Sequence, residues 1–118
     1  MSEQPAPRGG EPIAQRPVVS RTGDISVRTT ERGLPTEVKV GATEMSRAPD
    51  DLAAEILSLC KLSAMRLQVA RRRDLLDRGF SPAAVRGLNL ATEESLAKAE
   101  EEARGDDEGP PETWMRSR

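Results

Sequence analysis

The chain has 118 residues and a formal net charge of −2, with 18 Lys and Arg residues against 20 Asp and Glu residues, a length that corresponds to one small domain. It contains no His, one Cys, and a single Phe and a single Trp as its aromatic residues. This composition excludes the common zinc sites, an internal disulfide and Ser–His or Cys–His catalysis within one chain, and it predicts a small aliphatic core.

Residues 1–23 are rich in Pro and Gly and have almost no periodic apolar positions. Such a segment buries too little apolar surface to offset its ordering entropy, so we expect it to be disordered. The same reasoning predicts a disordered acidic tail over residues 105–118. The N-terminus lacks the apolar stretch of a signal peptide, and no run approaches the ~18–20 apolar residues of a membrane span. We therefore expect a cytoplasmic protein with no membrane-spanning segment, folded over residues 24–104.

The first regular pattern in the chain is a β-hairpin. Apolar and polar residues alternate over Asp24–Thr29 and again over Thr36–Val40, as they do in half-buried strands. Between them, Thr30–Gly33 is a turn in which Gly33 suits a positive φ angle. Pro35 fits the start of a strand or the edge of a sheet.

A long helix follows the hairpin. Pro49 suits its first turn, Asp50 and Asp51 favour its positive dipole end, and Gly79 is a natural stop. The residues between would span about 45 Å. At the helical spacing of about 100° per residue, one stripe should cover the hairpin; its members are Leu52, Ile56, Leu59, Cys60, Ser63, Ala64, Leu67 and Ala70. The sequence thus predicts an α+β fold in which an antiparallel hairpin packs on a long helix.

A second apolar stripe lies on the other side of this helix and consists of Leu62, Met65, Val69 and Leu76. A single hairpin cannot cover both sides of a helix, which leaves two alternatives. Either the following helices fold back over the stripe, or the stripe is a surface for self-association or for a partner. In the second case we expect a homodimer whose interface contains these four residues.

Two shorter helices are predicted after the long one. Ser81 caps the first, and Pro82 lies in its first turn. Thr92 caps the last helix, which we expect to run from Glu93 to Arg104 and to end at Gly105. This last helix is acidic and offers few apolar side chains, so we expect it to be peripheral.

The chain shows no pattern that predicts an enzyme. Cys60 lies in the apolar stripe without a nearby base, so we interpret it as a small hydrophobic core residue. The Glu residues of the last helix are not desolvated or held against a second element, and the Gly residues form no phosphate-binding loop. We therefore predict a non-enzymatic protein that uses no metal or other cofactor.

The only basic cluster is centred on Arg71, Arg72 and Arg73. Residues 46–88 carry eight cations and five anions, whereas residues 89–118 carry four cations and nine anions. Successive helical residues point ~100° apart, so the three arginines wrap around the helix, and the acidic tail competes for them. No aromatic platform exists for single-stranded nucleic acid. We interpret the cluster as a solvated charged face, with DNA binding through these arginines as the alternative.

The order of the central elements resembles that of a known family. A Gly, an alternating strand, a charged turn with Gly33, a second strand and a helix that begins Pro-Asp-Asp-Leu are similar to the hairpin-plus-helix half of YbaB/EbfC-type nucleoid-associated proteins. The match runs over about Gly23–Arg78. This resemblance implies dimers and DNA binding. Members of that family also have an amphipathic helix before the hairpin, where this chain has its Pro- and Gly-rich segment.

A second resemblance covers residues 24–104. The blocks Ile25–Thr29, Leu52–Leu57 and Gly87–Ser95 occur in the order and spacing of the EspD family, accessory proteins of actinobacterial type VII secretion. The resemblance implies a cytosolic factor that supports the stability or export of secretion substrates, whether or not it is itself exported. The chain has no Tyr and so cannot contain the Tyr-x-x-x-Asp/Glu export signal of small type VII substrates. The implied partners are secretion substrates or accessory proteins, in addition to the second copy expected from the apolar stripe.

Overall fold

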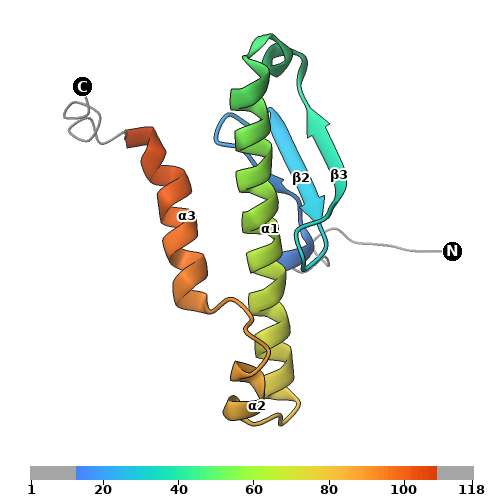
Figure 1. Cartoon of the computed structure of the whole chain (residues 1–118), viewed down its shortest axis with the longest axis vertical. Helices are drawn as coiled ribbons and strands as arrows, with labels where there is room; N and C mark the ends of the chain where they lie inside the picture. The colour runs from blue at the N-terminus through green and yellow to red at the C-terminus, as the bar shows by residue number, and fades with distance from the viewer. Residues whose placement is uncertain (1–12, 109–118) are drawn as a thin grey trace, which may run out of the picture.

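The protein, seen here as a computed structural model, is described over residues 13–108. The elements in chain order are the 3-10 helix η2 (Ile13–Gln15), the strands β1 (Val18–Val19), β2 (Ile25–Thr29) and β3 (Pro35–Val40), the 3-10 helix η3 (Ala42–Ser46), and the helices α1 (Pro49–Asp77), α2 (Pro82–Arg86) and α3 (Glu93–Glu108). The strands form one antiparallel sheet in the order β1-β2-β3, and this sheet packs along one side of α1 (Figure 1). The α+β fold expected from the sequence is confirmed.

Strand β2 is the centre of the fold because it has a neighbour on each edge and α1 on one face. Ile25 and Val27 are each 1% exposed, and both point toward α1. The register places Val27 opposite Val38 of β3 and opposite Val18 of β1. With these strand residues, Leu59, Cys60 and Leu62 of α1 complete a core that contains no aromatic ring.

The ordered chain begins earlier than the sequence predicted. Strand β1 pairs with β2, and Val18 is 2% exposed within the core. The Nη1 atom of Arg28 also donates a hydrogen bond to the carbonyl of Gln15, at 2.7 Å. The prediction of disorder over residues 1–23 therefore does not hold for residues 13–23, because a two-residue strand is too short for a periodic pattern and gains its burial from β2. The other parts of the predicted tails, residues 1–12 and 109–118, lie outside the described residues.

Helix α1 runs from Pro49 to Asp77, as its end signals predicted. Gly79 follows with a φ angle of +98°, a conformation that suits glycine, and its N–H donates to the carbonyl of Leu76 at 3.0 Å. The predicted sheet-facing stripe is buried at its middle, at Leu59, Cys60, Ser63 and Ala64. No helix within residues 13–108 is both long and apolar enough to cross a membrane.

The last two helices begin where the sequence predicted. The Ser81 hydroxyl accepts a hydrogen bond from the N–H of Ala84 at 3.1 Å, and the Thr92 hydroxyl accepts one from the N–H of Ser95 at 3.0 Å. Helix α3 does not end at Gly105, however, but continues to Glu108. One interior glycine costs a helix only about 1 kcal/mol, and the Asp and Glu residues that follow it stay helical.

Candidate functional site

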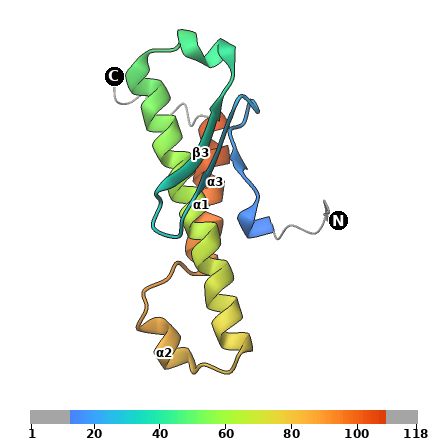
Figure 2. The same ribbon diagram turned by 90° about the vertical axis from the view of Figure 1, so that its right-hand side faces the viewer.

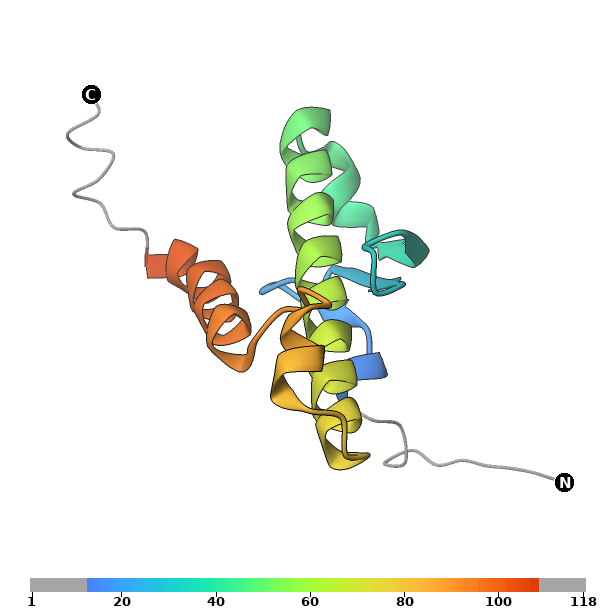
Figure 3. The same ribbon diagram turned by 60° about the horizontal axis from the view of Figure 1, so that its bottom comes forward.

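An open groove of about 1260 Å³ lies between β1, α1 and α3. Apolar side chains from all three elements line it: Val18, Val19, Ala54, Leu59, Leu62, Met65, Ala99 and Ala103. Figure 3 shows the reason for the opening, because α3 starts close to α1 and tilts away from it toward its C-terminal end. Polar and charged side chains line the rest of the groove, so its surface is mixed, with apolar residues that the chain itself leaves partly uncovered.

The composition of α3 explains why it does not close onto α1. Leu96 and Ala99 pack against the core, but the next three residues, 100–102, are all Glu. After Ala99, α3 therefore has no large apolar side chain within the described residues to hold it against α1. An ion pair between Arg66 Nε and Glu100 Oε2, at 3.1 Å, joins the two helices instead.

A network of three charged side chains stands at the end of the groove nearest the start of α1. Arg47 Nη1 lies 2.7 Å from Glu44 Oε1 and 2.6 Å from Glu55 Oε1, which ties η3 to the first turns of α1. Glu44 is buried, so Arg47 supplies the cation that its carboxylate needs there. These hydrogen bonds raise the pKa of Arg47 above its ordinary value. The groove is therefore lined by apolar side chains together with charges of both signs.

The second stripe predicted on α1 is divided between the core and this groove. Leu62 and Val69 are 8% and 3% exposed, whereas Met65 is half-buried and Leu76 is 38% exposed. Helices α2 and α3 pack against α1, as in the first alternative, but Leu62 also belongs to the core cluster that contains Val18, Ile25 and Val27 of the sheet. Leu62 and Val69 are consequently not free for the dimer interface expected from the sequence. Leu62 and Met65 line the groove, and Leu76 lies outside it.

The basic cluster is largely paired within the chain. Arg71 Nε lies 2.9 Å from Glu31 Oε1 in the β2–β3 turn, and Arg73 Nε lies 2.6 Å from Glu93 Oε2 at the start of α3. Arg72, between them, is half-buried. The three guanidinium groups therefore leave α1 in different directions, and two of them hold other elements in place.

The Arg73–Glu93 ion pair should be visible in a titration. The hydrogen bond from Arg73 lowers the pKa of Glu93 below its ordinary value of 4.5, so the folded state holds this proton less tightly than the unfolded state does. The stabilisation it gives is present above the unfolded pKa and is lost as the pH falls through the folded pKa. We expect Arg73→Gln to raise the pKa of Glu93 back toward its ordinary value in a carbon-13 NMR titration of the side-chain carboxyls. Lys98→Gln, on the same helix, is the control, and an unchanged Glu93 pKa in Arg73→Gln would contradict the pairing.

A smaller hollow of about 510 Å³ lies where the β2–β3 turn meets the segment before α3. Gln68 joins these two segments, because its Nε2 atom donates to the carbonyl of Glu31 at 2.8 Å and its Oε1 atom accepts from the N–H of Ala91 at 2.9 Å. Each polar atom of the Gln68 amide is thus used in holding the fold. The hollow therefore lies beside the contact through which Gln68 connects the β2–β3 turn to the segment before α3.

The remaining sequence candidate, Cys60, lies in the core cluster. Burial raises the pKa of its thiol, which disfavours the reactive thiolate. Among residues 13–108, no group of three or more Cys, Asp or Glu side chains is placed to hold a metal ion.

The groove was not predicted from the sequence because half of the apolar residues that line it lie in segments expected to be disordered or peripheral. Val18 and Val19 lie in the segment predicted to be disordered, and Ala99 and Ala103 lie in a helix predicted to be peripheral. The Val-Val pair after Pro17 was the one available signal, and two residues do not show a period. Comparison with known proteins adds no assignment: no protein-family model, no curated protein and no solved structure matches this chain.

Proposed function

We propose that this protein is a non-enzymatic accessory protein that binds a segment of another polypeptide, its client, in the groove between β1, α1 and α3. The observation that carries this proposal is the open apolar groove itself. Its accessible apolar residues include the exposed Val19 and the half-buried Met65, which lie over the buried core residues Leu59 and Leu62. An uncovered apolar surface with a charged rim is typical of a protein-binding site.

The shape and chemistry of the groove favour an amphipathic helix as the bound segment. A helix placed between two diverging helices can bury one apolar face in the groove and leave its polar face to solvent. Lys61 and Arg66 of α1 and Glu100 and Glu102 of α3 all line the groove, with Arg66 and Glu100 paired to each other at 3.1 Å, so the groove offers both charge signs to the edges of such a helix. Contact with Val19 and Met65 would supply affinity, and the charged residues of the groove would set the orientation.

The assignment to type VII secretion is supported by the blocks that resemble the EspD family. Ile25–Thr29 is the whole of β2, Leu52–Leu57 lies in the first turns of α1, and Gly87–Ser95 is the segment that leads into α3. These are the segments that build the core and carry α3 to its place beside α1. On this proposal the clients are secretion substrates or their accessory proteins, bound in the cytoplasm.

The test is a comparison of two glutamate variants in an affinity capture from nuclease-treated native lysate. Met65→Glu places a charge in the lining of the groove. Leu76→Glu introduces the same charged side chain at an apolar residue of α1 outside the groove. We expect a protein of the secretion system to be captured by the wild type and by Leu76→Glu, and its yield to fall at least about tenfold with Met65→Glu. Equal capture by all three proteins, each shown to be folded by circular dichroism, would refute the groove as the binding site.

DNA binding through the arginine cluster has less support. Arg71 and Arg73 are already paired with Glu31 and Glu93, and their ion pairs would have to break before they reached phosphates. Recovery of nucleic acid in the same capture without nuclease, and its loss on replacement of Arg71, Arg72 and Arg73 by Gln, would favour the DNA-binding alternative.

A further inference from the structure

Strand β3 is the outer edge of the sheet, and it is far more exposed than its neighbour β2. Pro35 to Lys39 are all exposed and Val40 is half-buried. In Figure 2, β3 runs along the front of the molecule, and among residues 13–108 no other strand pairs with its outer edge. An exposed edge of this length offers unpaired backbone groups to another strand.

The ladder with β2 determines which backbone groups of β3 point outward. The Gly41 N–H donates to the carbonyl of Asp24 at 2.7 Å, so Gly41 and Asp24 form a hydrogen-bonded pair. In an antiparallel ladder hydrogen-bonded and non-bonded pairs alternate, which makes Val40–Ile25 and Val38–Val27 non-bonded pairs. The N–H and C=O groups of Val38 and Val40 therefore point away from β2, toward the open edge.

The sequence of β3 is complementary to itself when two copies run antiparallel. With Val38 opposite Val38 of a second copy, Glu37 lies opposite Lys39 in both directions. In this register the two Val38 residues form a hydrogen-bonded pair, and the Glu37–Lys39 pairs become the non-bonded positions, where side chains are closest. Centring the pairing on Glu37 or on Lys39 would instead place like charges opposite each other. Only the register centred on Val38 places Glu37 opposite Lys39.

On the α1 side of such a joined sheet, apolar side chains of the two copies would lie next to each other. Val38 is 40% exposed and shares the α1 side of the sheet with Val27. Leu57 of α1, which is 67% exposed, lies two turns before Ala64 and on the same side of the helix. The Ala64 Cβ would lie 3.9 Å from a Cβ added at Gly33 of the β2–β3 turn, so this side of α1 is directed toward the hairpin. An edge pairing brings the apolar side chains of two copies together on this face.

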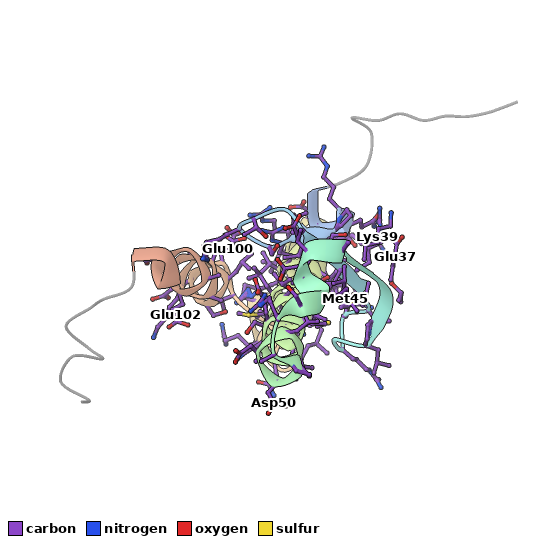
Figure 4. All side chains as sticks on the ribbon, turned by 90° about the horizontal axis from the view of Figure 1, so that it is seen from above. Glu37, Lys39, Met45, Asp50, Glu100 and Glu102 are labelled. Atoms are coloured by element: carbon purple, nitrogen blue, oxygen red, sulfur yellow. The ribbon has the colours of Figure 1, made fainter. Side chains whose placement is uncertain are left out.

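On the other face, Glu37 and Lys39 lie side by side. Their ion-pair distance is 3.4 Å, and Glu37 also accepts a hydrogen bond from Arg28 at 3.0 Å. Figure 4 shows Glu37 and Lys39 on the opposite side of the molecule from Glu100 and Glu102 of α3. The edge is therefore remote from the groove, and pairing there does not depend on what the groove binds.

We propose that the chain forms a two-fold dimer by antiparallel pairing of β3 with β3 of a second copy, centred on Val38, to give one six-stranded sheet. This interface replaces the α1 stripe as the site of self-association. It uses the exposed edge, the one register that pairs opposite charges, and the apolar strip that contains Val38 and Leu57.

The experiment is sedimentation velocity of the full-length protein and of three charge variants over a concentration series. Lys39→Glu puts Glu opposite Glu37 twice in the dimer, and we expect it to weaken dimerisation at least about tenfold. Combining Lys39→Glu with Glu37→Lys exchanges the charges and restores opposite pairs, so we expect the dissociation constant to return close to that of the wild type. Lys98→Glu, which changes the net charge by the same amount on α3, should leave it unchanged.

Hydrogen exchange on the wild type gives a second measurement that needs no variant. The amides of Val38 and Val40 should gain protection as the protein concentration rises, because they donate to the second copy only in the dimer. A wild type that is monomeric at ~100 μM would overturn the proposal, and so would a dimer that is indifferent to Lys39→Glu. A dimer lost with Leu76→Glu but kept with Lys39→Glu would place the interface on α1.

Discussion

Replacing Ile25 with alanine is expected to lower the free energy of unfolding by about 2–5 kcal/mol. Ile25 is the largest of the fully buried side chains and packs in the core with Leu59 and Cys60 of α1. The substitution removes buried methyl and methylene groups from the middle of the sheet and leaves a cavity that the surrounding strands cannot fill. Since the free energy of unfolding of a small domain is only about 5–15 kcal/mol, this substitution would remove a large share of it.

The measurement is urea unfolding followed by circular dichroism, with Leu88→Ala as the control. Leu88 is also an aliphatic residue, but it is exposed on the segment after α2, so its truncation should change the unfolding free energy by less than about 0.5 kcal/mol. Equal effects of the two variants would show that β2 is not the centre of the core.

Breaking the hydrogen bond between Thr29 and Ser63 is the second change with a large expected effect. The Thr29 hydroxyl donates to the Ser63 hydroxyl at 2.8 Å, and both side chains are buried between β2 and α1. Thr29→Val keeps the shape of the side chain but leaves the Ser63 hydroxyl without this donor. A buried polar group that loses its partner is destabilising by its full desolvation free energy. We therefore expect Thr29→Val to lower the free energy of unfolding by about 1–3 kcal/mol.

A double-mutant cycle distinguishes the hydrogen bond from a simple loss of packing. Ser63→Ala alone should also destabilise the fold, while Thr29→Val with Ser63→Ala should cost less than the sum of the two, because no unpaired hydroxyl remains. Strictly additive losses would mean that the two hydroxyls do not act as a pair. Urea unfolding of the four proteins under one set of conditions supplies the cycle.

Local signals in the sequence were sufficient to predict turns, helix starts and helix ends wherever a residue type directly constrains the backbone. Gly33 and Gly79 both adopt positive φ angles, at +89° and +98°, at the predicted turn and helix end. Pro49 and Ser81 mark helix starts for similar reasons, since each satisfies or removes an unpaired N–H of a first turn. These residues act within a few positions of themselves, so their effect can be read without knowing the rest of the fold.

Features that depend on distant residues were not predicted. Strand β1 forms because Val18 pairs with Val27, nine residues away in the sequence. The second stripe on α1 left two alternatives open because amphipathicity shows that a face is apolar but does not show what covers it. The tertiary structure buries both Leu62 and Val69, and Leu62 lies in one cluster with Val18, Ile25 and Val27 of the sheet.

The sequence by itself determined the β2–β3 hairpin, the length of α1 and an aliphatic core, because periodicity and capping are local properties of the chain. The groove between α1 and α3 and the open edge at β3 were decided only by the tertiary structure. Their apolar residues lie far apart in the sequence, and whether each surface is covered depends on how α3 tilts and on which strand ends the sheet. Burial is a property of the whole fold, so surfaces left uncovered appear only when all the elements are in place.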